Sequence, residues 1–194
     1  MKYLSKRILT YLQRNDIILI TPENESIYLY GFQTAIYTIF STIFLILIGI
    51  LLNRSFETIL LISIFYTNQT FGGGFHANSH TKCLLTMIAG LLLFVYLHNY
   101  YPPIITIIIL VSASFTILFL CPLVLHNNKQ YLSVYKSQLI IRSRISILVE
   151  VAMMLAYLMF QGKAFIRSIS YALCLSALSR IIGKLTIIYQ NARK

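Results

Sequence analysis

One stretch of the chain, from Phe71 to Cys83, carries the residue types of a catalytic site. It reads Phe-Gly-Gly-Gly-Phe-His-Ala-Asn-Ser-His-Thr-Lys-Cys, so three glycines precede two histidines and a cysteine. A thiolate attacks acyl carbons, and an imidazole can remove the thiol proton. We therefore predict a nucleophilic site in which Cys83 attacks and a histidine serves as base.

The three glycines, Gly72 to Gly74, predict a break in helical structure. Each glycine weakens a helix by ~1 kcal/mol relative to alanine. A membrane protein tolerates such a break only where protein or water satisfies the freed backbone groups. Glycine also lets another backbone approach closely.

Cys83 is expected in the first turns of the helix that follows. Asn78 or Ser79 can cap a helix that starts near His80. The positive end of that helix dipole and the neighbouring Lys82 would both favour the thiolate.

The identity of the base is open on spacing alone. Cys83 follows His76 by seven positions, which on an unbroken helix is ~10 Å along the axis and too far for a hydrogen bond. His80 is nearer on a regular helix, and spacing favours it. His76 can reach Cys83 only if the chain folds back through the glycines.

A zinc site is the alternative use of these side chains, because His76, His80 and Cys83 are all of zinc-ligand type. The His-Glu-x-x-His protease signature is absent, since Ala77 occupies the Glu position. Glu57 and Glu150, the acids beyond residue 25, belong to other segments. We expect no metal and no other cofactor.

The remaining cysteines and histidines are expected to be structural. Cys121 and Cys174 lie inside apolar runs, and three cysteines without CxxC spacing imply no disulfide framework. His98 and His126 lie at the ends of predicted spans, where a polar residue is ordinary.

Composition indicates a polytopic membrane protein of the all-α class. Of 194 residues 58% are hydrophobic and 11% charged, with a mean hydropathy of +0.76, whereas soluble domains carry about 25% charged residues. We expect a single membrane domain, 1–194, in which 1–20 form an amphipathic interfacial helix and 21–194 the transmembrane part. About six spans are expected, at the apolar runs 33–52, 56–70, 84–98, 103–125, 145–161 and 164–188.

Basic residues orient these spans. With a cytoplasmic N-terminus, thirteen of the sixteen Lys and Arg residues lie on the inner side, Arg180 and Lys184 among them. This arrangement predicts cytoplasmic N- and C-termini, and it places 71–83 at the cytoplasmic face. The net charge of +11 is not gathered in a long basic tract, so anionic inner-leaflet lipids, and not nucleic acid, are the expected partners.

At these residues the chain resembles the accessory gene regulator B (AgrB) family of bacterial cell-membrane endopeptidases. The likeness rests on Gly73-Gly74-Phe75-His76-Ala77, with Ser79 and Cys83 after them. The stretch from Cys121-Pro122 to Asn128-Lys129 resembles a Pro-Val…Asn-Lys segment of the family. Glu25 and Tyr30-Gly31 resemble its acidic and Tyr-Gly positions before the first span.

The resemblance implies a cysteine endopeptidase with His76 as general base and Cys83 as nucleophile. Its substrate would be a short amphipathic precursor peptide, cut at the cytoplasmic face through a thioester. A Cys or Ser of the peptide would then attack the thioester and close a thiolactone or lactone autoinducer. Family members act as homodimers.

One departure concerns the position before the glycines. The family commonly has an Arg there, and this chain has Gln69 and Thr70. The substrate or oxyanion would then be held by Lys82, Ser79 or the amides of Gly72 to Gly74. The alternative function is a small peptide transporter or exporter in which the glycine break is an unwound binding segment.

Overall fold

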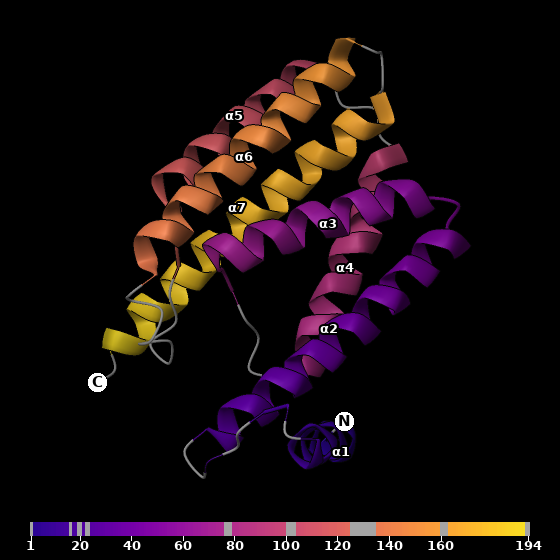
Figure 1. Cartoon of the computed structure of the whole chain (residues 1–194). Helices are drawn as coiled ribbons and strands as arrows, with labels where there is room; N and C mark the ends of the chain where they lie inside the picture. The colour runs from indigo at the N-terminus through magenta and orange to yellow at the C-terminus, as the bar shows by residue number, and fades with distance from the viewer. Residues whose placement is uncertain are drawn as a thin grey trace. The chain divides into compact units, whose positions relative to one another are not determined.

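A computed structural model describes residues 2–15, 17–18, 21, 24–75, 79–99, 104–124, 135–159 and 163–192. In these ranges every regular element is an α-helix, which confirms the all-α prediction for this part of the chain (Figure 1). The seven helices are α1 (Lys2–Arg14), α2 (Glu25–Leu51), α3 (Ser55–Gly72), α4 (His80–Asn99), α5 (Ile104–Leu120), α6 (Lys136–Met159) and α7 (Lys163–Ala192).

The chain forms two compact units, Met1–Leu47 and Ile48–Lys194. The first unit holds α1 and most of α2. The helix predicted in residues 1–20 is present as α1, in which Leu9 is buried and Tyr11 exposed. Its interfacial position in a membrane stays a prediction, as does the single membrane domain.

The second unit begins with a tight turn between α2 and α3. Asn53 has a positive φ of 54°, and the Arg54 amide donates to the Gly49 carbonyl at 2.8 Å while the Asn53 amide donates to Ile50. This is a Schellman motif, in which a residue of left-handed conformation ends the helix. Gly49 also leaves room for Thr58 of α3, because a Cβ there would lie 2.5 Å from the Thr58 hydroxyl.

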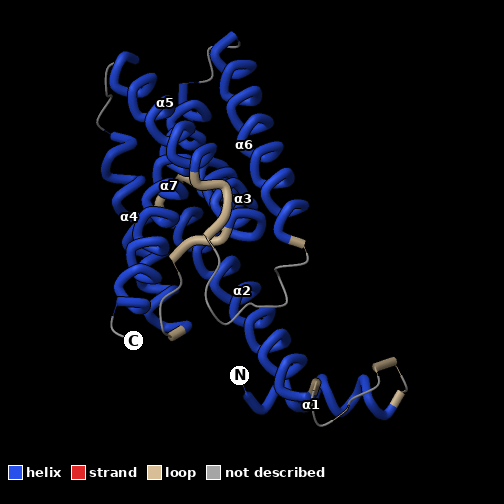
Figure 2. Tube along the Cα trace, turned by 90° about the vertical axis from the view of Figure 1, so that its left-hand side faces the viewer, coloured by secondary structure: helices blue, strands red, loops and turns tan. Residues whose placement is uncertain are grey.

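Helix α7 is the centre of the second unit, where it contacts α3, α4, α5 and α6 (Figures 1 and 2). Ile169 and Leu173 of α7 are fully buried, together with Leu118 of α5 and Ile147 of α6. Small residues allow this close packing of helices. The buried small residues of α7 are Ser168, Ser170, Ala172, Ser176 and Ala177.

The helices differ in their fitness to cross a bilayer. Among the described residues, Glu25–Leu51 and Ala164–Gln190 are long and apolar enough to span, while Thr81–Leu97 and Ile105–Leu120 are shorter apolar helices. The short run predicted at 56–70 lies within the longer helix α3, and residues 145–159 of the run predicted at 145–161 lie in α6. The count of six spans stays a prediction.

Candidate functional site

Cys83 lies in the first turn-and-a-half of α4, as its residue pattern predicted. Ser79 caps this helix, because its hydroxyl accepts a hydrogen bond from the Lys82 amide at 3.3 Å and its carbonyl accepts one from the Cys83 amide at 3.1 Å. Serine is a favoured N-cap because it satisfies an amide that has no partner inside the helix. The prediction of a cap at Asn78 or Ser79 is confirmed for Ser79.

The Cys83 side chain is exposed, so a peptide can reach its sulfur. Neighbouring protein atoms still remove part of its water shell, and this burial raises the pKa of the Cys83 thiol above its ordinary value. The result differs from the expectation that the helix dipole and Lys82 favour the thiolate. The cause of the raised pKa is desolvation by the neighbouring protein atoms.

The two candidate bases differ in what is described of them. His76 lies outside the described residues, with Ala77 and Asn78, and the structure gives no position for it. His80 is the first residue of α4, and only its backbone is described. Lys82, a predicted oxyanion candidate, is exposed beside Cys83.

The glycine break is real, and protein groups satisfy it. Helix α3 ends at Gly72, where Gly73 adopts a φ of 67° and donates its amide to the Gln69 carbonyl at 3.0 Å. The Gly72 carbonyl accepts the Val124 amide at 2.8 Å, and Gly73 and Val124 form an isolated parallel bridge. Since α4 starts at His80, no single helix runs from His76 to Cys83.

Glycine is required here by close approaches. A Cβ at Gly73 would lie 2.3 Å from the Val124 carbonyl oxygen. A Cβ at Gly74 would lie 2.7 Å from the Ser179 hydroxyl of α7. The segments that follow α3 and α5 therefore lie against each other and beside α7, as the loop segments in Figure 2 show.

Phe75, the last described residue before His76, is fixed to α7. Its amide donates to the Ser179 carbonyl at 2.9 Å and to the Ser179 hydroxyl at 3.1 Å. Gln69 of α3 donates to the same hydroxyl. His76 therefore follows directly on a residue that is fixed to α7. The chain from Phe75 to Ser79 can span at most about 14 Å.

Helix α4, which carries Cys83, is also held by α7. The Tyr171 hydroxyl donates to the Gly90 carbonyl at 2.9 Å, and the Tyr171 and Phe94 ring centroids lie 5.3 Å apart. Both segments that flank the predicted site are therefore positioned by the same helix.

Sequence reasoning missed a buried polar network beside the glycine break. Arg180 of α7, Asn68 of α3 and Glu150 of α6 are 1%, 1% and 3% exposed. The Arg180 guanidinium lies inside the helix bundle, and its assignment to the inner side of the membrane stays a prediction. Glu150 is near the middle of α6. Charged residues within apolar runs were the available sign, since such residues usually face a bundle interior and pair there.

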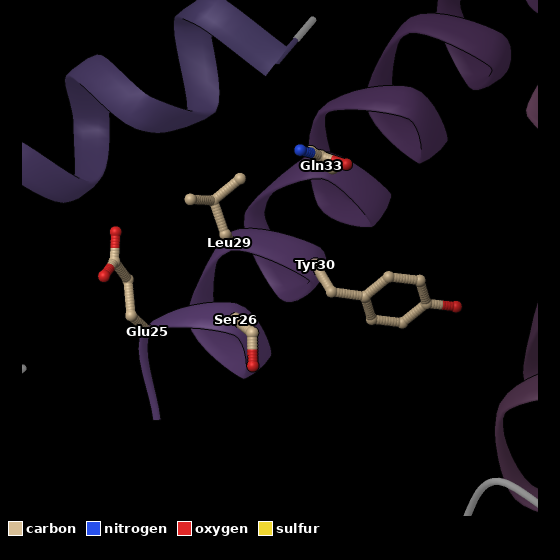
Figure 3. Close-up of a pocket in the computed structure, with 5 residues that line it drawn as sticks. All are labelled: Glu25, Ser26, Leu29, Tyr30 and Gln33. Atoms are coloured by element: carbon tan, nitrogen blue, oxygen red, sulfur yellow. The ribbon is translucent and has the colours of Figure 1, made fainter. Parts of the chain in front are cut away.

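The structure also has a hollow that does not include the predicted catalytic residues. A shallow hollow of about 420 Å³ is lined by residues of α2 alone, among them Glu25 and Tyr30, and by no predicted catalytic residue (Figure 3). No group of three metal-ligating side chains occurs within the described ranges. His76 and the His80 side chain lie outside those ranges, so the expectation of no metal stays a prediction.

Comparison with known proteins decides the family. The family model of accessory gene regulator B matches residues 5–182, which is most of the chain. The chain belongs to the accessory gene regulator B family. The matched residues include the glycine break, His76, Cys83 and the network around Arg180.

Membership in the accessory gene regulator B family gives the broad function. The family takes part in processing accessory gene regulator autoinducers, is generally one of membrane proteases, and is associated with membranes. Comparison with curated proteins and comparison with solved structures each returned no match.

Proposed function

We propose that this chain is a cysteine endopeptidase of the cell membrane, with six spans and cytoplasmic termini. It cleaves a short amphipathic precursor peptide at the cytoplasmic face through an acyl-enzyme on Cys83. The observation that carries the proposal is an exposed cysteine in the first turns of α4, beside a break in helical structure that leads into His76. The family match supports the same chemistry.

The reaction begins at the scissile carbonyl. A histidine takes the thiol proton, and the Cys83 sulfur attacks the carbonyl carbon to form a tetrahedral oxyanion. The oxyanion collapses to a thioester and expels the amine of the C-terminal fragment, which takes the proton from the imidazolium. A Cys or Ser side chain of the bound peptide then attacks the thioester, which closes the ring and returns the proton to the Cys83 thiol.

His76 is the proposed base, on the family resemblance. Its neighbour Phe75 is fixed on α7, and α4 starts only at His80, so the ~10 Å of helix axis that would separate His76 from Cys83 on one helix does not apply. The raised pKa of the Cys83 thiol gives this base a necessary role.

Lys82 is the proposed oxyanion partner. It is exposed next to Cys83, whereas the Gly73 amide already donates to the Gln69 carbonyl. A charge placed where the oxyanion develops lowers the barrier more than one that binds the ground state.

The test replaces Cys83 by Ala and by Ser in cells that also make a tagged precursor peptide. Both variants should abolish cleavage, with Cys174→Ala of α7 as the matched control. Cleavage by Cys83→Ala at the control rate contradicts the proposal. His76→Ala and His80→Ala identify the base, because only the true base should cost activity by about 100-fold or more.

A transporter or exporter without covalent chemistry is the second candidate. The buried Arg180 and Glu150 favour it, because charged groups inside a bundle often mark substrate pathways. Alkylation of Cys83 separates the two, since it stops a peptidase while a transporter continues to move cargo.

The proposed enzyme acts as a homodimer, which predicts that two differently tagged copies copurify.

A further inference from the structure

The buried guanidinium of Arg180 lies where α3 ends, directly beside the glycine break. One of its terminal nitrogens, Nη1, donates to the Leu118 and Cys121 carbonyls, both at 3.1 Å. The other, Nη2, donates to the Ser143 hydroxyl at 2.9 Å. Arg180 therefore ties α7 to the end of α5 and to α6.

Asn68 connects this guanidinium to a carboxylate. Nη2 of Arg180 lies 3.4 Å from both the backbone and the side-chain oxygen of Asn68. The Asn68 amide nitrogen donates to the two Glu150 oxygens at 3.0 and 2.8 Å. The positive and negative charges are thus joined through an amide, and α3, α6 and α7 each contribute one residue.

The absence of a side chain at Gly72 leaves space for the Arg180 guanidinium. A Cβ at Gly72 would lie 2.0 Å from Nη2 and 2.3 Å from the guanidinium carbon of Arg180. One turn further along α7, a Cβ at Gly183 would lie 2.7 Å from the Gly74 carbonyl carbon. Because Gly72 and Gly183 have no side chains, α7 can pack against the glycine break at both Gly72 and Gly74.

Stability alone gives a weak reason for this arrangement. Burying a charge pair costs desolvation, and a well-packed apolar replacement is often as stable. A guanidinium differs from an apolar side chain in that its planar set of donors fixes the directions of several carbonyls at once. Nη1 of Arg180 fixes the Leu118 and Cys121 carbonyls at the end of α5. The Arg180 side chain also lies against Gly72, the last residue of α3.

We propose that Arg180 is a positioning residue for the cleavage reaction: it clamps the end of α3 and the glycine break, from which the chain continues to the proposed base His76. Asn68 and Glu150 hold the guanidinium in place. This inference rests on the proposed peptidase function. Arg180 touches neither the substrate nor the reacting atoms.

The first test is Arg180→Lys in the full-length protein, reconstituted in nanodiscs with the precursor peptide. Lysine keeps the charge but cannot reach the Leu118, Cys121 and Ser143 oxygens together. The value of kcat should fall by about 100-fold, the effect of a catalytic group misplaced by ~1 Å, while KM stays within about twofold. Only Arg180→Lys protein that remains monodisperse and helical is compared with the wild type.

A second readout does not depend on turnover. The rate at which iodoacetamide alkylates Cys83 at neutral pH reports how far the base assists the thiol. Arg180→Lys should slow this alkylation as much as His76→Ala does. The double variant should be no slower than either, because both changes remove the same assistance.

The second variant reaches the same contact from the other side. Gly72→Ala should displace the Arg180 guanidinium while keeping every residue of the network, and it should reproduce the loss of kcat and the slower alkylation. Gly90→Ala of α4 is the matched control, since its Cβ would meet only Leu175 methyl groups at 3.7 and 3.8 Å. The control should match the wild type in both measurements.

Wild-type kcat and alkylation rate in Arg180→Lys and Gly72→Ala would overturn the inference. So would a lower melting temperature with unchanged kcat, which is the result expected of a purely structural network. These outcomes are separate from failure of the proposed function. If Cys83→Ala still cleaves the precursor, the peptidase proposal fails whatever the Arg180 variants do.

Discussion

The Phe75 backbone amide donates two hydrogen bonds to Ser179, one to its carbonyl and one to its hydroxyl. The pair fixes the residue before His76 to α7. Because α7 also holds α4 through Tyr171 and Gly90, one helix carries both flanks of the proposed catalytic pair.

Ser179→Ala should loosen the anchor of Phe75 without removing it. The hydroxyl that accepts from Phe75 and Gln69 is lost, while the bond to the Ser179 carbonyl remains. We expect the free energy of unfolding to fall by about 1 kcal/mol and cleavage to slow. Ser176→Ala is the control, because that buried hydroxyl donates only within α7, to Ala172; equal slowing in both variants would contradict the prediction.

Gly73→Ala should be among the most damaging substitutions of a small residue. Its φ of 67° and ψ of −164° cost a non-glycine residue roughly 1–3 kcal/mol, and the Cβ would lie 2.3 Å from the Val124 oxygen. We expect a loss of more than about 2 kcal/mol in detergent unfolding. Gly31→Ala of α2, with nothing within 4 Å of its Cβ, should leave stability equal or raise it.

Glu150→Ala should destabilise the protein far more than loss of an acid nearer the surface. It leaves the buried Arg180 without its counter-charge and should cost about 3 kcal/mol. Glu57→Ala removes a pair with Arg54 at 3.2 Å whose side chains keep 17% and 33% exposure, and should cost less than about 1 kcal/mol. Similar unfolding midpoints for the two variants would refute the buried charge pair.

The alkylation rate of Cys83 should depend on pH in a direction set by its environment. Burial raises the pKa of the Cys83 thiol, so the reactive thiolate is scarcer at neutral pH than in a free cysteine. In His76→Ala, the alkylation rate should keep rising with pH beyond about 8.5, the ordinary thiol value. A plateau below that pH would show a depressed pKa and contradict the burial effect.

Local features of the site were predictable from the sequence because they depend on neighbouring residues. Ser79 caps α4 through its own side chain and the amide of Lys82. The helix break at Gly72 to Gly74 follows from the low helix propensity of glycine. The helix start near His80 was predicted from the cap residues Asn78 and Ser79, and α4 begins there.

The electrostatic state of Cys83 was not predictable in this way. Lys82 and the helix dipole are visible in the sequence and favour the thiolate, but desolvation depends on atoms from segments distant in the chain. That effect has the opposite sign.

The sequence by itself determined the class of the protein, its helices and the residue types of its site, since periodicity, composition and caps act over a few residues. Only the tertiary structure decided what the glycines accommodate. Gly72 receives Arg180 from more than a hundred positions away, and Gly73 receives Val124. Such contacts depend on which helices pack together, and a single apolar pattern fits many packings. For the same reason Arg180, counted with the inner-side basic residues, lies inside the bundle with Asn68.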